Sequence, residues 1–219
     1  MKYDWSVVWE YRWELLGGVY VTFIIALLTM AIAIPLGIAV MMLRQSGNAV
    51  LRWCGGFFVE FFRNIPLILL VVWVFYAIPI FFGVRMGNFA TSVTALVLGI
   101  AAYNAENFRA GVNSVRRGQS EAGLALGMSQ WQVTRVVVLP QAIRRVVPVL
   151  ASTWVSLFKA TSLVSVINVV ELSYVGTAIR GETFRVLEIL TAVAVIYWLL
   201  GYPQAKLADF LNRKYGVVE

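Results

Sequence analysis

The sequence contains no histidine and a single cysteine, Cys54. Without histidine the chain cannot build a Cys/His metal site or use an imidazole as a general base, and one cysteine excludes a disulfide framework. A Gly-x4-Gly-Lys-Ser/Thr loop for nucleotide phosphates is also missing, so we expect no metal site and no cofactor in this chain. Charged residues are scarce at 13%, whereas soluble domains carry about 25%.

Apolar residues are abundant instead. Hydrophobic side chains make up 60% of the 219 residues, and the mean hydropathy is +0.79. This exceeds what a soluble core needs and therefore indicates contact with a lipid bilayer. The net charge of +7 does not indicate nucleic acid, because the basic residues fall at the ends of apolar segments rather than along one helix.

Five apolar segments are long enough to cross a bilayer as helices. They cover about residues 17–43, 60–83, 89–110, 142–166 and 184–208. The stretch before the first segment carries three acidic residues against two basic ones, which is the wrong charge for a signal peptide, so we expect the segment to be retained. The alternation of outer-membrane strands is absent. The expected fold is therefore all-α: a polytopic membrane protein of about five helices, with residues 1–219 forming a single transmembrane domain.

The basic residues also predict the orientation of these segments. With the N-terminus outside, twelve of them lie on the cytoplasmic side, five lie outside, and Lys159 falls within a span. The cytoplasmic set is Arg44, Arg52, Arg63, Arg109, Arg116, Arg117, Arg135, Arg144, Arg145, Lys206, Arg213 and Lys214, and the outer set is Lys2, Arg12, Arg85, Arg180 and Arg185. Because positive charge accumulates on the cytoplasmic side, we expect the N-terminus outside and the C-terminus in the cytoplasm.

The longest polar stretch, at about residues 111–141, is expected on the cytoplasmic side and shows the pattern of two short helices. Ser120 is placed to cap the first helix, Glu121 lies in its first turn, and Gly127 is placed to end it in a left-handed conformation. Ser129 and Gln132 predict a capping box for the second helix.

The second short helix is expected to run to about residue 138 and to end at Pro140. Apolar side chains gather near the bend between the two helices, and small residues lie beside them. Two interpretations remain open on this basis: an apolar knob that inserts into a groove of a partner protein, or an amphipathic segment that lies on the lipid surface.

This segment resembles the "EAA loop" of ABC importer permeases, on the residues Glu121-Ala122-Gly123-x3-Gly127-x9-Val137-x-Leu139-Pro140. Gly123 replaces the usual alanine and Val137 the usual isoleucine. In that family the loop forms coupling helices that dock on a cytoplasmic ATPase subunit. The resemblance thus implies that these residues couple the chain to an ATPase: Glu121, Ala122, Gly123, Leu126, Gly127, Met128, Trp131, Leu139 and Pro140.

Three further motifs are similar to the polar amino acid uptake branch of these permeases. They are Phe62-Arg63-Asn64-Ile65-Pro66-Leu67, Ala102-Tyr103-x-Ala105-Glu106-x2-Arg109-x-Gly111 and Lys159-Ala160-Thr161-Ser162-Leu163. The resemblance covers about residues 17–210. One departure is Ala160, where many relatives carry an acidic or amide residue.

The resemblance implies a complex in the bacterial inner membrane. It would hold this chain, a second permease subunit (a copy or a paralogue), two ATPase subunits that bind ATP and Mg, and an extracytoplasmic binding protein that delivers a polar amino acid. We expect no enzyme activity in the chain and lean towards acidic or amide substrates such as glutamate, aspartate or glutamine. A membrane enzyme would need a deep acid–base pair or metal ligands, and an ion-driven carrier would typically show internal repeats.

Candidate residues for a substrate path are Tyr103, Glu106, Lys159, Thr161 and Ser162. An ammonium group inside a span needs a partner or water, because burying it costs at least about 2.5 kcal/mol. Lys159 could bind a substrate carboxylate, form a structural ion pair with Glu106, or lie near a surface if the helix breaks at Thr161. Glu106 and Arg109 are one turn apart and are expected to pair with each other.

Overall fold

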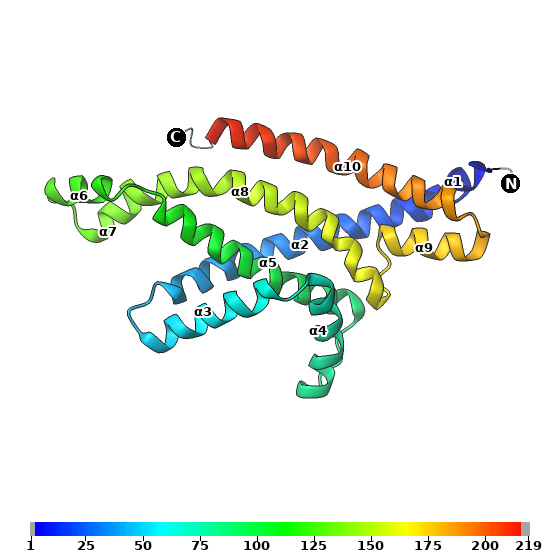
Figure 1. The fold of residues 1–219 in the computed structure, drawn as a ribbon, viewed down its shortest axis with the longest axis horizontal. Coiled ribbons are helices and arrows are strands. Elements are labelled where there is room, and N and C mark those ends of the chain that lie inside the picture. The colour runs from blue at the N-terminus through cyan, green and yellow to red at the C-terminus, as the bar shows by residue number, and fades with distance from the viewer. Residues whose placement is uncertain (1–2, 216–219) are drawn as a thin grey trace.

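The computed structural model describes residues 3–215, which form helices and the turns between them without any strand. Three long helices run along the molecule: α2 (Arg12–Arg44), α8 (Leu139–Ala160) and α10 (Val186–Tyr215). α5 (Asn88–Asn113) packs along α2, and α8 packs against both α5 and α10 (Figure 1). The predicted all-α class is confirmed.

The number of spanning helices differs from the five that we expected. Three stretches are long and apolar enough to cross a membrane: α2, the run from Gln130 to Ile167, and α10. A fourth is obtained if α3 (Ala49–Asn64) and α4 (Leu67–Phe82), which are bent by 112°, count as one broken span. α5 is not among these stretches, and it carries polar residues both in its first turns and after Tyr103.

The sharp bend between α3 and α4 has a local cause. Ile65 is extended, with a ψ of 131°, and it precedes Pro66. A proline ring clashes with a helical residue before it, so α3 must end at Asn64. The segment expected as one span at residues 60–83 is therefore two helices, and α4 projects away from the long axis of the molecule (Figure 1).

The core lies where α2, α4, α5 and α8 meet. Gly37 of α2 lies so close to α5 that a Cβ atom there would be 2.9 Å from the Cβ of Asn104. Small residues allow helices in membranes to approach closely and gain dispersion contacts. The largest buried apolar side chains of this core are Ile25, Leu70, Leu96, Leu157 and Phe158.

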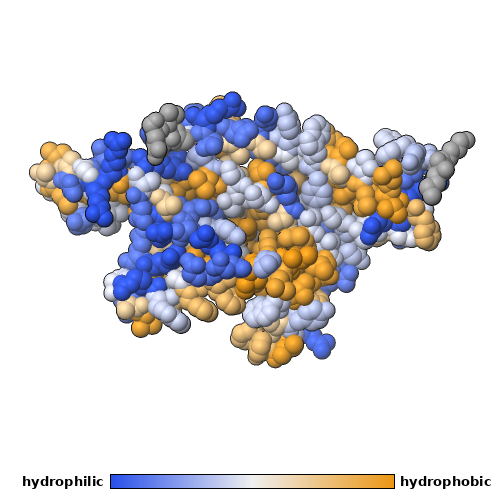
Figure 2. Space-filling model, in the orientation of Figure 1, coloured by the Kyte–Doolittle hydropathy of each residue, from blue (hydrophilic) through white to orange (hydrophobic). Residues whose placement is uncertain are grey.

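Much of the outer surface is apolar, as a lipid-facing surface must be. Large side chains such as Trp73 and Phe81 on α4 and Trp198 and Leu199 on α10 are exposed. Figure 2 shows hydrophobic residues over the middle of the molecule and on α4, with hydrophilic residues towards the end that carries α6 (Arg117–Ala125) and α7 (Gln130–Gln132).

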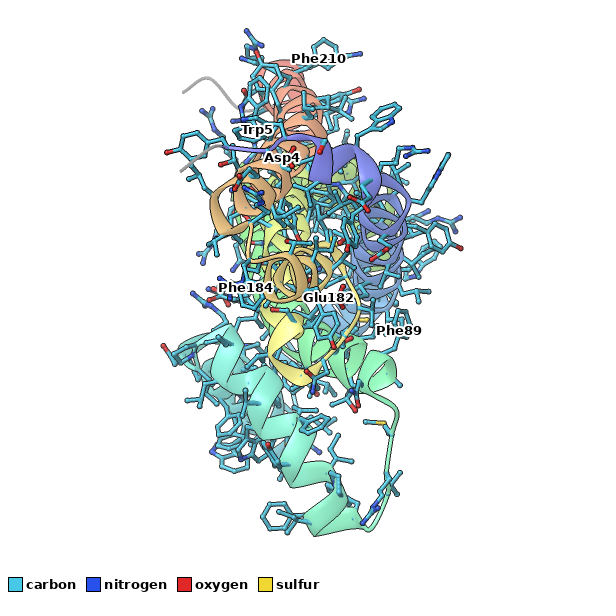
Figure 3. All side chains as sticks on the ribbon, turned by 90° about the vertical axis from the view of Figure 1, so that its right-hand side faces the viewer. Asp4, Trp5, Phe89, Glu182, Phe184 and Phe210 are labelled. Carbon is cyan, nitrogen blue, oxygen red and sulfur yellow. The ribbon has the colours of Figure 1, made fainter. Side chains whose placement is uncertain are left out.

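The two ends of the molecule are built differently. α6 and α7 lie at one end, and α1 (Ser6–Glu10) and α9 (Leu172–Thr183) lie at the other (Figure 1). Figure 3 looks onto the second end, with Asp4 and Trp5 beside α1 and with Glu182 and Phe184 at the end of α9. The described parts of the chain thus begin at one end and finish near the other.

Candidate functional site

The end of α6 is formed as the sequence predicts. Gly127 has a φ of +81°. Its N–H donates to the carbonyl of Leu124 at 2.9 Å, and the N–H of Met128 donates to the carbonyl of Gly123 at 3.1 Å. These two bonds form a Schellman motif, which satisfies the last carbonyl groups of the helix and requires a left-handed residue that glycine supplies without strain.

The predicted start of α6 is wrong. α6 begins at Arg117, and Ser120 lies inside it rather than at its N-cap. The N–H of Gln119 donates to the carbonyl of Arg116 at 2.9 Å, so the first turn closes through backbone bonds. No side-chain cap is needed there, and a serine inside a short helix is tolerated at small cost.

The second short helix begins as predicted but does not end as predicted. Ser129 and Gln132 form the capping box, with bonds of 2.8 and 3.3 Å. α7 then passes into a π-helical stretch, η1 (Val133–Val138), which continues directly into α8. Pro140 lies in the first turn of α8 and does not terminate a helix. The wider π-helical turns remove the regular i−4 partner that a proline would disrupt.

The coupling segment, defined here as residues 117–140, has an apolar tip. Leu126 is 83% exposed and Trp131 is 64% exposed, and the guanidinium of Arg135 lies 4.9 Å from the centre of the Trp131 ring. The other predicted coupling residues are mostly exposed too. Glu121, Ala122, Gly127, Leu139 and Pro140 are exposed, Met128 is half-buried, and Gly123 is buried.

Gly123 is buried against η1, and an added methyl group there would be tight. A Cβ atom at Gly123 would lie 3.0 Å from the Cγ2 of Val133 and 3.4 Å from the sulfur of Met128. α6 and η1 thus pack closely against each other at Gly123, and the segment folds as one compact hairpin.

Glu106 lies in an ion cluster that joins two helices. Its carboxylate accepts bonds from Arg109 one turn away, including one from Nε at 3.1 Å, and pairs with Arg44 of α2. The pair with Arg109 confirms the expectation, whereas Arg44, 62 positions away, was not foreseen. The alternative of a structural pair between Glu106 and Lys159 is wrong, because both Glu106 oxygens are bound by arginines.

Lys159 lies at the end of α8, where the helix breaks. α8 ends at Ala160 and a 3-10 helix, η2 (Thr161–Ile167), follows, as one of our three interpretations expected. Lys159 is exposed, and no ion pair to it occurs among residues 3–215. A cationic side chain in the last turn also complements the helix dipole.

Lys159 lines a cavity of about 460 Å³ between α8, η2, α9 and α10. This cavity, called the Lys159 cavity below, has one ammonium group and four hydroxyl-bearing residues in a lining that is otherwise mainly apolar. Its residues are Val155, Lys159, Ser162, Ser173, Tyr197, Trp198, Gly201, Tyr202 and Ala205. Ser162 was predicted, whereas Ser173 and Tyr197 come from segments far along the chain and were missed.

The remaining predicted path residues do not line this cavity. Thr161 is buried, and its hydroxyl donates to the carbonyl of Phe158 at 2.8 Å. Tyr103 donates its hydroxyl to the carbonyl of Arg63 at 3.2 Å, and the Arg63 guanidinium lies over its ring. The predicted path thus separates into the Lys159 cavity and a polar cluster around Glu106 and Tyr103.

A buried carboxylate lies behind the cavity wall. Glu171 is 0% exposed and caps α9: Oε1 accepts from the N–H of Tyr174 at 2.8 Å, and Oε2 accepts from the N–H of Ser173 at 2.9 Å. The hydroxyl of Tyr197 also donates to Oε2, at 2.8 Å. Burial raises the pKa of Glu171 above its usual value, although these hydrogen bonds act in the opposite direction.

Glu171, Arg180, Glu182 and Arg185 follow the fourth apolar segment in the sequence, where each is interpreted by default as a solvated loop charge and alternatively as a contact to the binding protein. For Glu171 both interpretations are wrong, because the short connection after η2 folds back into the core and buries it. The N–H of Leu172, the next residue, donates to the hydroxyl of Thr22 on α2 at 3.2 Å. Arg185 is also bound: its guanidinium lies 3.7 Å from Glu188 and 4.0 Å from Asp4. An acidic residue just before a helix, Glu171-Leu172-Ser173, was the available signal for the cap.

The sequence is similar to those of known membrane transport proteins. The sequence model of the family described as "binding-protein-dependent transport system inner membrane component" matches residues 33–217. The glutamine transport system permease protein GlnP of Escherichia coli is 36% identical over 219 residues, covering 100% of both chains. The glutamate/aspartate import permease protein GltK of Escherichia coli is 31% identical over 220 residues, covering 97% of this chain and 98% of the other.

The fold is also found among solved structures. A crystal structure of an amino acid ABC transporter with histidines contains a chain that superimposes on this one with a TM-score of 0.92. The two sequences are 27% identical, and the match covers 98% of this chain and 100% of that chain. The superimposed region thus includes nearly the whole chain.

Proposed function

The chain belongs to the family of binding-protein-dependent transport system inner membrane components, and on this basis we propose that it is the permease subunit of an ATP-driven importer of polar amino acids. The main support for this proposal is the full-length similarity of the chain to permeases of glutamine and of glutamate/aspartate import. The substrate is proposed to be an acidic or amide amino acid, namely glutamate, aspartate or glutamine.

The chain spans the membrane several times as a multi-pass inner-membrane protein. We propose the N-terminus outside and the C-terminus in the cytoplasm, which puts the coupling segment on the cytoplasmic side. The distribution of basic residues supports this orientation. The separation of α6 and α7 from α1 and α9 at opposite ends of the molecule is also consistent with it.

ATP hydrolysis is proposed to act through the coupling segment. A partner ATPase would bind ATP and Mg and would contact the exposed tip at Leu126 and Trp131. Two observations support this role: the apolar tip is exposed at the end opposite α9, and the segment is continuous with α8. Closure of two ATPase subunits would then move this chain and a second permease between two states of access.

The Lys159 cavity is proposed as part of the substrate path. The ammonium of Lys159 would bind a substrate carboxylate, and Ser162 would add a hydroxyl. The absence of an ion-pair partner for Lys159 among residues 3–215 supports a role towards a ligand rather than towards the fold. An extracytoplasmic binding protein would deliver the amino acid to this side of the complex.

Reconstituted transport tests the proposal. The chain is incorporated into proteoliposomes with its ATPase and binding protein, and uptake of labelled glutamine, glutamate and aspartate is measured with and without internal ATP. We expect uptake that requires ATP and the binding protein. Uptake driven by an ion gradient without the ATPase, or a binding protein that takes only sugars or metal ions, would contradict the proposal.

A further inference from the structure

Glu171 occupies a position that cap formation alone does not explain. Its carboxylate is fully buried and joins three elements: α9 through the N–H groups of Ser173 and Tyr174, α10 through Tyr197, and the connection after η2 to which it belongs. Aspartate, asparagine or serine would cap α9 without burying so large an acidic side chain. The additional bond that glutamate makes is the one to Tyr197.

This bond determines the direction of the Tyr197 hydroxyl proton. A carboxylate can only accept hydrogen bonds, so the single proton of the Tyr197 hydroxyl is directed to Glu171. The Ser173 hydroxyl donates in turn to the oxygen of Tyr197, at 3.3 Å. Both residues line the cavity, and with their protons directed within the network their hydroxyl oxygens keep lone pairs that can accept a further hydrogen bond.

The cavity is therefore polarised. Lys159 is its only basic lining residue, and it lies on the α8 side. Ser173 of α9 and Tyr197 of α10 belong to the opposite wall, and the Glu171 carboxylate is bonded to Tyr197. In an apolar environment such a buried negative charge acts over a longer range than in water. A positive and a negative pole in one cavity match the two charges of an α-amino acid.

We propose that Glu171 is a positioning residue, which orients the hydroxyls of Tyr197 and Ser173 as acceptors for the α-ammonium group of a zwitterionic amino acid whose carboxylate binds Lys159. The proposal rests on the proposed function of amino acid import. It assigns recognition of the amino acid backbone to this cavity and leaves the apolar lining residues Val155, Trp198 and Ala205 for contact with the substrate side chain.

The test compares each amino acid with its deaminated analogue. The intact complex of permeases and ATPases, in lipid nanodiscs, is titrated calorimetrically with glutamine, glutamate, aspartate, histidine and arginine, and the strongest ligand is paired with the same acid lacking its α-amino group. We expect the amino acid to bind at least about ten-fold more tightly, since a hydrogen bond to a charged group is worth about one factor of ten in affinity.

Tyr197→Phe and Glu171→Gln are expected to weaken binding of the amino acid about ten-fold while leaving binding of the deaminated analogue unchanged. Tyr197→Phe keeps the cap of α9, because both N–H bonds to Glu171 remain. Tyr174→Phe is the matched control: it removes a hydroxyl from the first turn of α9, outside the Lys159 cavity, and should preserve the discrimination.

The outcomes separate the two levels of the argument. If the wild-type complex binds an amino acid but Tyr197→Phe and Glu171→Gln weaken both ligands equally, or weaken neither, the positioning role is wrong while the proposed function stands. If the wild-type complex and its binding protein take none of the five amino acids, the proposed function itself fails. A merely structural Glu171 would lower the melting temperature of Glu171→Gln without changing the preference for the amino group.

Discussion

Trp131 and Lys159 lie on one continuous helical run, from Gln130 to Ile167, that joins the tip of the coupling segment to the wall of the cavity. At about 1.5 Å per residue, the 28 residues between them span roughly 40 Å. Under the proposed coupling, a displacement at the tip would be transmitted along this run to the cavity wall on α8. The π-helical stretch and the 3-10 helix lie at the two ends of α8, where the direction of the chain can change.

Substitution of the exposed tip should uncouple transport from ATP hydrolysis. Leu126→Asp places a charge on an apolar contact surface, where it must be desolvated on docking, and we expect loss of the ATPase during purification of the tagged permease. Ala49→Asp is the control, because it adds the same charge to an exposed position in the first turn of α3, where the helix dipole favours it. Equal recovery of ATPase with both variants would contradict a docking role.

Gly127→Val should give the same uncoupling by a different route. A β-branched residue is strained at a φ of +81°, at a cost of about 1–2 kcal/mol, so the Schellman motif opens and Leu126 leaves its position. Membrane insertion should remain normal, since the change is confined to the coupling segment. Uptake by the reconstituted complex, measured per molecule of ATP hydrolysed, is the appropriate readout, and a wild-type ratio would argue against the motif.

The sequence predicted those features that are stabilised locally. The Gly127 end, the Ser129 capping box and the Glu106–Arg109 pair each depend on residues within a few positions of one another. The expected cap at Ser120 is a local error, because the first turn of α6 closes through backbone bonds instead. Other errors concern long-range context. Glu171 is buried because Tyr197 of α10 contacts it and Thr22 of α2 contacts the next residue, Leu172. Neither contact can be predicted from the residues around Glu171.

Proline produced the other two discrepancies. Pro66 divides an expected single span, since Ile65 cannot be helical before it, whereas Pro140 was expected to end a helix and lies inside a continuous run. The same residue type thus breaks one helix and is accommodated in another. The difference is the π-helical stretch before Pro140, and π-helical turns cannot be predicted from hydrophobic periodicity.

Removal of the Glu106 carboxylate should weaken the contact of α2 with α5. Glu106→Gln leaves Arg44 and Arg109 without their shared partner, and their guanidinium groups repel each other. Because the side chains are partly exposed, we expect a loss of only about 1–2 kcal/mol, seen as a lower melting temperature in detergent. Adding Arg44→Met should recover part of that loss, and strictly additive effects would show that the two residues are not coupled.

Two glycines of the same helix provide a test of close helix packing. Gly37→Ala should destabilise the protein by about 1–3 kcal/mol, because its Cβ would lie 2.9 Å from Asn104 and 3.1 Å from a backbone oxygen of α5. At Gly17 of α2 nothing lies within 4 Å of the added Cβ. Gly17→Ala should therefore leave the melting temperature unchanged or raise it slightly, since alanine favours the helix. A similar loss in both variants would show that helix propensity, not packing, determines the effect.

The pH dependence of stability should report on Glu171. Burial raises its pKa in the folded protein, so folding is favoured most when the carboxyl is protonated in both states, below the ordinary glutamate pKa. As the pH rises through the folded-state pKa, this contribution is lost. The titratable side chain facing Glu171 is Tyr197, whose hydroxyl donates to it, and Thr22 on α2 carries no charge. The melting temperature of the wild type minus that of Glu171→Gln should therefore fall as the pH rises above the ordinary glutamate pKa. A difference that stays constant or rises over this range would mean that hydrogen bonding, rather than burial, dominates the ionisation of this carboxyl.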